Sequence, residues 1–315
     1  MRVVIGGGTG FVGRALTQLL RSKGHEVTVI SRQPGPGRIT WDDLKSKGLP
    51  PCDGAVNLAG EPVLNPLRWW NESYKRDLVS SRVETTCALA QAIATATQPP
   101  HAWVLVTGVA CYKPSETERY TEGSAVGQFD LLSRLVKQWE EAGVLPETVA
   151  PGTRQVIVRA GAVLGRDGGA VQMMLWPFWL GLGGPLGSGR QPFPWIHVSD
   201  LAGIIAHALQ QDNRGPRQGE GEKGEEEEVV GVQGILNGVA PADDTNADFV
   251  RALGGAMGRP TLLSMPGFAL NATLGRERAV ILLEGQRVVP ERTLASGYVY
   301  RYPDLHSALN EIVGS

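Results

Sequence analysis

The feature that most constrains this chain is a glycine-rich segment, GGTGFVG, close to its start. The segment places Gly7, Gly10 and Gly13 three residues apart, between an expected strand over residues 2–5 and an expected helix over residues 11–22. Between a strand and a helix, the first glycine permits a tight turn and the second lets a pyrophosphate approach the backbone. The third allows the helix to pack closely against the strand. The spacing therefore predicts a dinucleotide-binding turn.

The amide groups at the start of this helix are the expected anion-binding groups. The N–H groups of its first turn, which contains Phe11 and Val12, have no partner inside the helix, and the helix dipole favours negative charge there. A glycine turn that only connects strand to helix is the alternative. We favour the dinucleotide site because the strand before the turn and the helix after it are both present in the pattern.

The end of the second expected strand, residues 25–30, indicates which dinucleotide binds. An NAD site usually has an acid there, which accepts a hydrogen bond from the ribose 2′-hydroxyl. This chain instead reads VTVISRQ, with Ser31 and Arg32 at that place. A hydroxyl and a guanidinium suit a 2′-phosphate, which an acid would repel. We therefore expect NADP as the cofactor, with a solvated Arg32 of no role as the alternative.

Short apolar runs alternate with helical patterns through the first two hundred residues. Continuous apolar strands separated by helices are typical of a parallel sheet covered on both faces. Right-handed crossovers then give an α/β fold with the doubly wound order of the Rossmann fold. The expected strands are residues 2–5, 25–30, 55–58, 103–107 and 155–159, and the expected helices are residues 11–22, 79–94 and 129–142.

The second half of the chain has a different character. After residue 165 glycine and proline become frequent, as in GLGGPLGSGRQPFPW, which indicates loops and a smaller lobe. We expect a Rossmann domain over residues 1–165, with core strands continuing to about residue 240, and a substrate lobe over residues 166–315. Further helices are expected at residues 200–211, 246–257 and 305–313, a strand at 234–239, and Trp176, Trp179 and Trp195 in the core or lining a pocket.

Residues 212–233, DNRGPRQGEGEKGEEEEVVGVQ, interrupt this pattern with seven acids and three bases. A segment of low hydrophobicity and like charge cannot offset the entropy of ordering. We expect a disordered acidic insert at the surface, and rate an acidic partner-binding segment lower.

Composition excludes several other classes of protein. Apolar residues make up 42% and charged residues 20% of the 315 residues, with a net charge of −2. This balance is ordinary for a globular enzyme and lacks the basic excess that nucleic-acid binding needs. No apolar run is long enough to span a membrane, so we expect neither a nucleic acid nor a membrane as a partner. Three separated cysteines suggest buried, reduced thiols and no metal site.

The start of the chain also bears on the compartment. Its first residues run directly into the glycine segment, so we expect no cleaved signal peptide. The cytoplasm is the expected compartment, and import into an organelle without a cleaved presequence stays open.

With these residues placed, the chain resembles the extended and atypical short-chain dehydrogenase/reductases, in the branch that is similar to nucleotide-sugar epimerases. Within it, the chain looks like the small "epimerase family" group. The likeness covers nearly the whole length except the acidic insert. It is carried by GGTGFVG, AVNLAGE at 55–61, WVLVTGVACY at 103–112, VRAGAVLG at 158–165, PWIHVSDLAGIIAHAL at 194–209 and the carboxyl-terminal VVPERTLASGYVYRYPDLHSAL.

The resemblance implies further cofactor contacts. Asn57, Leu58 and Ala59 would lie along the adenosine and ribose, since they end a strand at the edge where ligands bind. Asp77 and Arg82 would be additional contacts, with a surface pair of no role as the alternative. The resemblance also implies that the backbone of Ala160 lies near the nicotinamide.

One departure from the superfamily pattern limits the functional prediction. Ordinary members carry a Tyr-x-x-x-Lys pair on the helix after the fourth strand, in which the lysine lowers the tyrosine pKa for proton exchange with the substrate. The corresponding helix here reads FDLLSRLVKQWEEA. Aligning Glu140 with the family's helical acid puts Leu132 at the tyrosine place and Val136 at the lysine place, and neither side chain titrates.

Two hydroxyl groups near the expected nicotinamide are the catalytic candidates that remain. Thr107 ends the fourth strand and Tyr112 follows five residues later. Each has a structural alternative, as a backbone hydrogen-bonding group and as a pocket wall. For His197 we favour a structural role, with Asp200 capping the following helix.

Three functions are consistent with these residues. The first is an NADP-dependent oxidoreductase that acts on a small carbonyl or alcohol with an unconventional proton donor or with water. The second is an epimerase that retains its cofactor, and the third is a non-catalytic NADP(H)-binding or redox-sensing protein. We favour the first, with a small-molecule substrate and a homodimer left open.

Overall fold

The computed structural model describes residues 1–65, 68–210 and 231–314. A central sheet of seven parallel strands runs through it in the order β10-β7-β5-β4-β1-β2-β3. This order confirms the predicted doubly wound α/β fold. The strands are β1 (Arg2–Gly6), β2 (Glu26–Ser31), β3 (Arg38–Thr40), β4 (Gly54–Asn57), β5 (Ala102–Gly108), β7 (Arg154–Ala160) and β10 (Gly234–Gly238).

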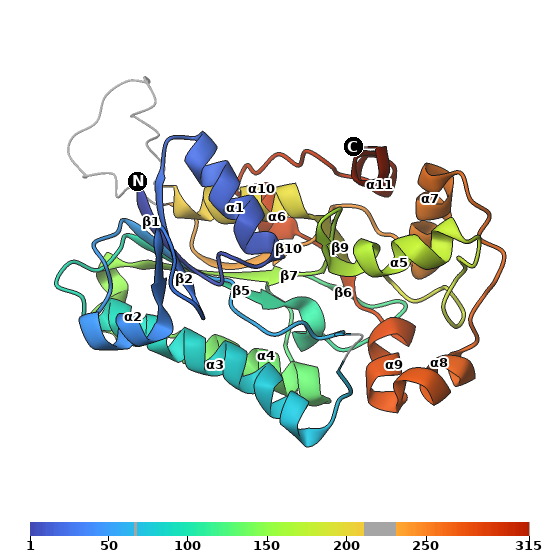
Figure 1. The fold of residues 1–315 in the computed structure, drawn as a ribbon, viewed down its shortest axis with the longest axis horizontal. Helices are drawn as coiled ribbons and strands as arrows, with labels where there is room; N and C mark the ends of the chain where they lie inside the picture. The colour runs from blue at the N-terminus through green and yellow to red at the C-terminus, as the bar shows by residue number, and fades with distance from the viewer. Residues whose placement is uncertain (66–67, 211–230, 315) are drawn as a thin grey trace.

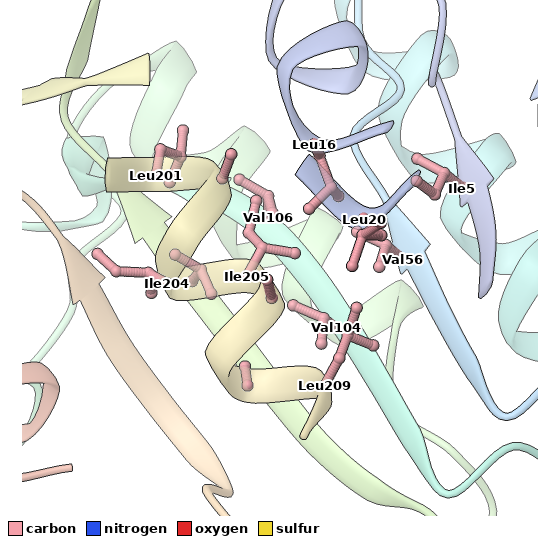
Figure 2. Packing of buried hydrophobic residues seen from close by; sticks show 14 of the residues in the cluster. Ile5, Leu16, Leu20, Val56, Val104, Val106, Leu201, Ile204, Ile205 and Leu209 are labelled. Atoms are coloured by element: carbon pink, nitrogen blue, oxygen red, sulfur yellow. The ribbon is translucent and has the colours of Figure 1, made fainter. Parts of the chain in front are cut away.

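Two helices cover one face of this sheet, α1 (Phe11–Ser22) and α6 (Val198–Leu209). Figure 2 shows their apolar side chains packed on those of the strands, with Leu16 and Leu20 beside Ile5 and Val56. Leu201, Ile204, Ile205 and Leu209 of α6 lie over Val104 and Val106 of β5. The other face carries α2 (Trp41–Lys47), α3 (Glu72–Ala94) and α4 (Leu131–Ala142), and a second apolar cluster fills that layer.

The strand order reverses direction at β1. From β1 the chain builds outward through β2 and β3, and then returns to place β4 on the other side of β1. In an open α/β sheet the crevice outside such a switch point, at the carboxyl ends of the strands, is where ligands bind. The glycine segment lies at this point, directly after β1.

The remaining elements lie mostly beyond the carboxyl ends of the strands (Figure 1). An apolar cluster that includes Trp195, Phe249 and Leu309 holds several of them together. These elements are β6 (Arg119–Tyr120), β8 (Ala162–Gly165), α5 (Gly169–Trp179), β9 (Trp195–His197), α7 (Asn246–Met257), α8 (Gly267–Leu274), α9 (Arg276–Leu283), β11 (Arg287–Val288), α10 (Glu291–Ala295) and α11 (Leu305–Gly314), with 3-10 turns at Val109–Cys111 and Ala150–Gly152.

Several predicted elements differ from the observed ones. The helix expected at 79–94 begins seven residues earlier, at Glu72, because the Asn71 side chain accepts a hydrogen bond from the Tyr74 N–H and caps it there. The helix α2 was not expected, although Thr40 and Asp43 form a capping box at its start. The helix expected at 246–257 is confirmed with the same bounds.

The second half also contains α5 where loops were expected, with Pro177 inside the helix. We expected Trp176 and Trp179 either in the core or lining a pocket. They do not lie in the core, since their side chains are 73% and 56% exposed. Trp195 is buried as expected. Of the three thiols, Cys52 and Cys111 are buried, but Cys87 is exposed on α3.

The acidic insert predicted at 212–233 falls almost entirely outside the described residues. Among the helices that the structure describes, none is long and apolar enough to cross a membrane.

Candidate functional site

The turn between β1 and α1 requires glycine at two of the three predicted positions. Gly7 has a φ of +75°, and a Cβ added to it would lie 2.7 Å from the backbone nitrogen of Ala59. A Cβ on Gly13 would lie 2.4 Å from the carbonyl oxygen of Gly7. Because both close contacts are with backbone, any side chain there would displace the turn. The turn therefore brings β1, α1 and the end of β4 closer together than other residues allow.

The start of α1 offers backbone donors to a ligand. Gly10 is the N-cap residue and brings no side chain to the helix terminus. The Arg14 N–H donates to the Gly10 carbonyl at 2.9 Å, which closes the first helical turn. The N–H groups before it, those of Phe11, Val12 and Gly13, precede the first helical hydrogen bond and have no partner within the helix. This is the arrangement that binds a pyrophosphate.

The segment after β4 is fixed in place beside this turn. The Leu58 N–H donates to the Gly6 carbonyl at 2.8 Å. The Asn57 side chain is buried, accepts from the Ala59 N–H at 3.0 Å and donates to Thr86 Oγ1 of α3 at 2.8 Å. The structure thus brings together the predicted residues Asn57, Leu58 and Ala59 with the glycine turn, with the Asn57 side chain holding the loop.

The two residues chosen for the 2′-phosphate lie at the end of β2. Ser31 is buried, and its hydroxyl donates to the carbonyl of Gln33. The Arg32 side chain is 89% exposed, and its Nη1 lies 3.9 Å from a carboxylate oxygen of Glu61. A loose, exposed pair of this kind holds a guanidinium weakly. Arg32 is therefore available to bind an anion, which would compete with the Glu61 carboxylate for the guanidinium.

Arg82 reaches the same loop from α3. It is buried and donates to the carbonyls of Leu78 at 3.1 Å and Glu61 at 2.7 Å. Burial lowers the pKa of the Arg82 guanidinium to about 10. Asp77 lies half-exposed on the same helix and pairs with Arg68 at 2.8 Å. Asp77 and Arg82 therefore have separate partners and do not form the surface pair considered as an alternative.

Three polar side chains form one row across the sheet near its carboxyl edge. Thr107 of β5 and Asn237 of β10 are both register partners of Arg159 of β7, so all three project from the same face. Together with neighbouring side chains they make what we call the closed polar cluster, which consists of Thr107, Tyr112, Glu122, Glu140, Arg159 and Asn237.

Hydrogen bonds connect every member of the closed polar cluster. Arg159 donates to both carboxylate oxygens of Glu140, at 2.9 and 2.8 Å, and Thr107 donates to the same carboxylate at 3.0 Å. Arg159 also donates to the Tyr112 hydroxyl at 3.0 Å, and that hydroxyl donates to Asn237 Oδ1 at 2.9 Å. The backbone N–H of Asn237 donates to Glu122 at 2.9 Å. The bidentate pair is inside the protein, with 3% of the Arg159 side chain exposed and 15% of Glu140.

The surroundings within this cluster fix the protonation states of Arg159 and Tyr112. Burial alone would lower the pKa of the Arg159 guanidinium, but its hydrogen bonds to Glu140 raise it overall, so it stays charged. Burial raises the pKa of the Tyr112 phenol, and the adjacent Arg159 guanidinium offsets only part of that. The phenol is consequently held in its neutral form at physiological pH.

This arrangement bears on the two predicted catalytic residues. Tyr112 is fully buried, Thr107 is nearly so, and both hydroxyls are engaged within the protein. Proton transfer from either would require these bonds to break first. At the places of the usual Tyr and Lys, Val136 is buried and Leu132 packs partly buried against apolar neighbours. Ala160, expected near the nicotinamide, is the half-buried last residue of β7.

His197 has a structural role, as predicted, but it is His197 and not Asp200 that caps α6. The N-cap of α6 is His197, whose Nδ1 accepts from the Ser199 N–H at 3.2 Å, so the prediction that Asp200 caps this helix is wrong. Asp200 is buried in the first turn and accepts hydrogen bonds from the backbone of Arg301 and Tyr302 and from the Tyr298 hydroxyl. It therefore ties the carboxyl-terminal segment to α6.

Sequence reasoning missed four residues that shape this site. Glu61 stands at the end of the AVNLAGE motif, and Arg159 in the VRAGAVLG motif, but neither motif shows which side chain each one faces. The roles of Glu140 and Asn237 depend on strand register and helix placement, which spacing along the chain does not give. Among the described residues, no group of three or more His, Cys, Asp or Glu side chains could hold a metal ion.

Two family models match the chain. The model of the NAD dependent epimerase/dehydratase family matches residues 3–220, which include the β1–α1 turn and the closed polar cluster apart from Asn237. A domain of unknown function (DUF1731) matches residues 265–312, from the segment before α8 into α11.

Known proteins resemble the chain over its whole length. Epimerase family protein SDR39U1 of Bos taurus is 60% identical over 99% of this chain and 100% of its own length. Epimerase family protein SDR39U1 homolog, chloroplastic, of Arabidopsis thaliana is 33% identical over 99% of this chain and 87% of its own length. The crystal structure of human epimerase family protein SDR39U1 (isoform 2) with NADPH has a TM-score of 0.91 and 56% identity, over 100% of this chain and 99% of that chain. UDP-N-acetylglucosamine 4-epimerase of Bacillus cereus has the same fold, with a TM-score of 0.72 at 15% identity over 99% and 98%.

Proposed function

Because the chain belongs to the NAD dependent epimerase/dehydratase family, we propose that it binds NADP(H) and acts as an oxidoreductase on a small carbonyl or alcohol. The observation that carries this proposal is that the β1–α1 turn offers backbone donors at the switch point of the sheet, with an exposed Arg32 at the end of the adjacent strand β2. The human relative whose structure contains NADPH is 56% identical, which supports the choice of cofactor.

The residues of this turn fit such a dinucleotide. Gly7 and Gly13 allow β1, α1 and the end of β4 to approach closely, and Gly10 brings no side chain to the helix terminus, so a diphosphate can reach its N–H groups. Arg32 is free enough to exchange its 3.9 Å contact with Glu61 for a bidentate contact with a 2′-phosphate. The loop held by Asn57 supports the adenosine end, and the Ala160 backbone would lie toward the nicotinamide.

When bound, NADPH would supply the hydride for a carbonyl carbon, and the protein would have to position the substrate and allow a proton to reach its oxygen. Tyr112 and Thr107 stand near the strand ends where this occurs, but their hydroxyls are held by Asn237 and Glu140. In this proposal they keep the ends of β5, β7 and β10 rigid, and the proton comes from water.

A second candidate function is a non-catalytic NADP(H)-binding protein. The closed polar cluster favours it, because the hydroxyls of Tyr112 and Thr107 are occupied and apolar Leu132 and Val136 stand at the places of the usual Tyr and Lys. Such a protein would use the same turn and the same Arg32, so cofactor binding alone does not separate the two functions.

Turnover separates them. Cofactor-stripped protein is given NADPH and a panel of carbonyl compounds, and the absorbance of NADPH is followed. Consumption of NADPH supports the oxidoreductase, whereas tight binding with no consumption across the panel supports the non-catalytic protein. Conversion of a nucleotide sugar with no net change in NADPH would instead indicate an epimerase with retained cofactor. If an active substrate is found, Tyr112→Phe and Thr107→Ala should retain turnover, and its loss in either variant would assign that residue a catalytic role.

A further inference from the structure

A large apolar surface lies on the lobe that contains α5 and α8. Trp176 is 73% exposed, Leu262 is 87% exposed and Phe268 is 77% exposed, although side chains of this size are normally buried. Soluble monomers rarely expose contiguous apolar patches of this kind unless they bind something. We call this surface the tryptophan face; its exposed residues are Trp176, Trp179, Leu180, Leu182, Leu262, Leu263, Met265 and Phe268.

These residues come from two segments that pack against each other. A Cβ added to Gly184 would lie 1.9 Å from the Leu263 carbonyl oxygen, so the two backbones are in contact. The Met265 N–H donates to the Pro185 carbonyl at 3.0 Å. The rings of Trp176 and Trp179 lie 6.2 Å apart, edge to face. The segments that carry the tryptophan face are therefore in contact with each other, at the end of the molecule that carries α5 and α8 (Figure 1).

The charged residues that adjoin these two segments in the sequence are mostly arginines, although Arg190 is itself paired with Glu116 at 3.7 Å. Residues 168–189 and 260–275 contain no charged side chain. Of the four charged residues that bound these segments, three are arginines, Arg190, Arg259 and Arg276, and the fourth is Asp167. The Arg259 guanidinium lies 5.7 Å from the centre of the Trp179 ring, at the edge of the apolar surface.

We propose that the tryptophan face docks the protein onto the surface of an anionic lipid bilayer. Tryptophan with leucine and phenylalanine is the composition that enters the interfacial layer of a membrane, and arginines beside them attract anionic headgroups. A second copy of the chain fits this face less well. In a two-fold dimer the same patch meets itself, and neither segment contains an acid that could pair with Arg259 or Arg276 of the other copy.

Surface attachment is a different property from spanning. The sequence predicts no membrane partner because no apolar run is long enough to cross a bilayer. A docked face needs only exposed apolar side chains with cationic neighbours. The inference stands independently of the proposed oxidoreductase activity, since it uses no residue of the cofactor site.

Vesicle sedimentation tests the inference with the full chain. The protein is mixed with vesicles of phosphatidylcholine alone and with vesicles that also contain phosphatidylglycerol. We expect it to sediment with the anionic vesicles and to be released by salt, because the headgroup attraction is screened. Trp176→Glu and Leu262→Glu should each weaken binding at least about tenfold, since each puts a charge into the interfacial layer. Arg259→Gln should reduce the preference for phosphatidylglycerol.

The matched control is Val144→Glu, which adds the same charge at another exposed apolar residue. Val144 is 66% exposed and lies just after α4, beside the start of β7 and away from the tryptophan face. The Val144→Glu variant should bind vesicles as strongly as the original chain does. The inference would be overturned if the protein bound neither type of vesicle. It would also be overturned if Val144→Glu weakened vesicle binding as much as Trp176→Glu and Leu262→Glu do. Light scattering that shows a dimer disrupted by Trp176→Glu, with no vesicle binding, would assign the face to a second copy instead.

Discussion

The β1–α1 turn and the closed polar cluster lie at the same edge of one sheet, but their polar groups are used in opposite ways. At the turn, the first N–H groups of α1 and the Arg32 guanidinium face outward with weak partners or none within the helix. In the cluster, Arg159, Glu140 and Tyr112 are buried and hydrogen-bonded to one another. The polar groups at the turn can therefore bind a ligand, whereas those of the closed polar cluster are already hydrogen-bonded within the protein.

This difference shows where binding and stability reside in the molecule. A buried charge costs free energy unless it is paired, so the cluster must remain closed for the fold to be stable. The exposed groups at the turn contribute little to stability, and changing them should affect the ligand alone. Substitution of an exposed group at the turn and substitution within the cluster should therefore have opposite signatures in unfolding and in cofactor binding.

The largest expected effect is on the stability of the cluster. Glu140→Gln leaves the Arg159 guanidinium buried without its anion, and should lower the free energy of unfolding by about 3–5 kcal/mol. Urea denaturation measures this change. The matched control is Glu141→Gln on the same helix, whose exposed pair with Lys137 at 3.8 Å should be worth less than about 1 kcal/mol. Equal effects of the two substitutions would contradict the role given to the cluster.

The next effect tests the packing of the turn. Gly13→Ala puts a methyl group 2.4 Å from the Gly7 carbonyl oxygen, and should cost about 1–3 kcal/mol of stability by overpacking. It should also abolish measurable NADPH binding, because the helix terminus is displaced. Gly255→Ala is the control, since no atom lies within 4 Å of its Cβ position in α7, and it should be stabilising by about 0.5–1 kcal/mol. A Gly13→Ala protein that is as stable as the original would show that the turn is looser than described.

A change confined to the ligand is expected at Arg32. Arg32→Ala should weaken NADPH binding by about 1.5–3 kcal/mol, the strength of a hydrogen bond to a charged group, which is roughly ten- to hundredfold. NADH binding and the unfolding curve should stay unchanged, because the side chain is 89% exposed. Titration calorimetry with both nucleotides measures this. If preference for NADPH persists in Arg32→Ala, the 2′-phosphate is recognised elsewhere.

The smallest expected effect is a difference in chemical reactivity between buried and exposed cysteine thiols. Burial raises the pKa of both Cys52 and Cys111 to about 12, whereas Cys87 is exposed. The thiolate is the reactive form, so an alkylating reagent near neutral pH should modify Cys87 and leave the other two intact. Mass spectrometry of the native protein counts the modified sites. Modification of Cys111 at a rate similar to that of Cys87 would mean that the region around the cluster opens readily.

Of the two regions, the β1–α1 turn was more predictable from the sequence than the closed polar cluster. The glycine spacing, the flanking strand and helix, and the missing acid after β2 are all local features, and the structure places Gly7, Gly13, Arg32 and Asn57 at one point. Local signals also gave α7 with the observed bounds.

The closed cluster was not predictable, for a physical reason. Thr107, Arg159 and Asn237 meet because three strands pair in one register, and Asn237 comes 78 residues after Arg159. The same limit explains the exposed Trp176 and Trp179, because an apolar pattern does not show which face of a helix remains uncovered. The prediction that Asp200 caps α6 is wrong because the hydrogen-bond partners of Asp200 come from residues 298–302, about a hundred positions later in the sequence.

Titration calorimetry of the cofactor-stripped protein with NADPH and with NADH tests the central claim most directly. The account predicts heat of binding with NADPH at a single site and clearly weaker binding with NADH, because the amide groups of the turn hold the diphosphate and Arg32 holds the 2′-phosphate. No heat with either nucleotide would contradict it.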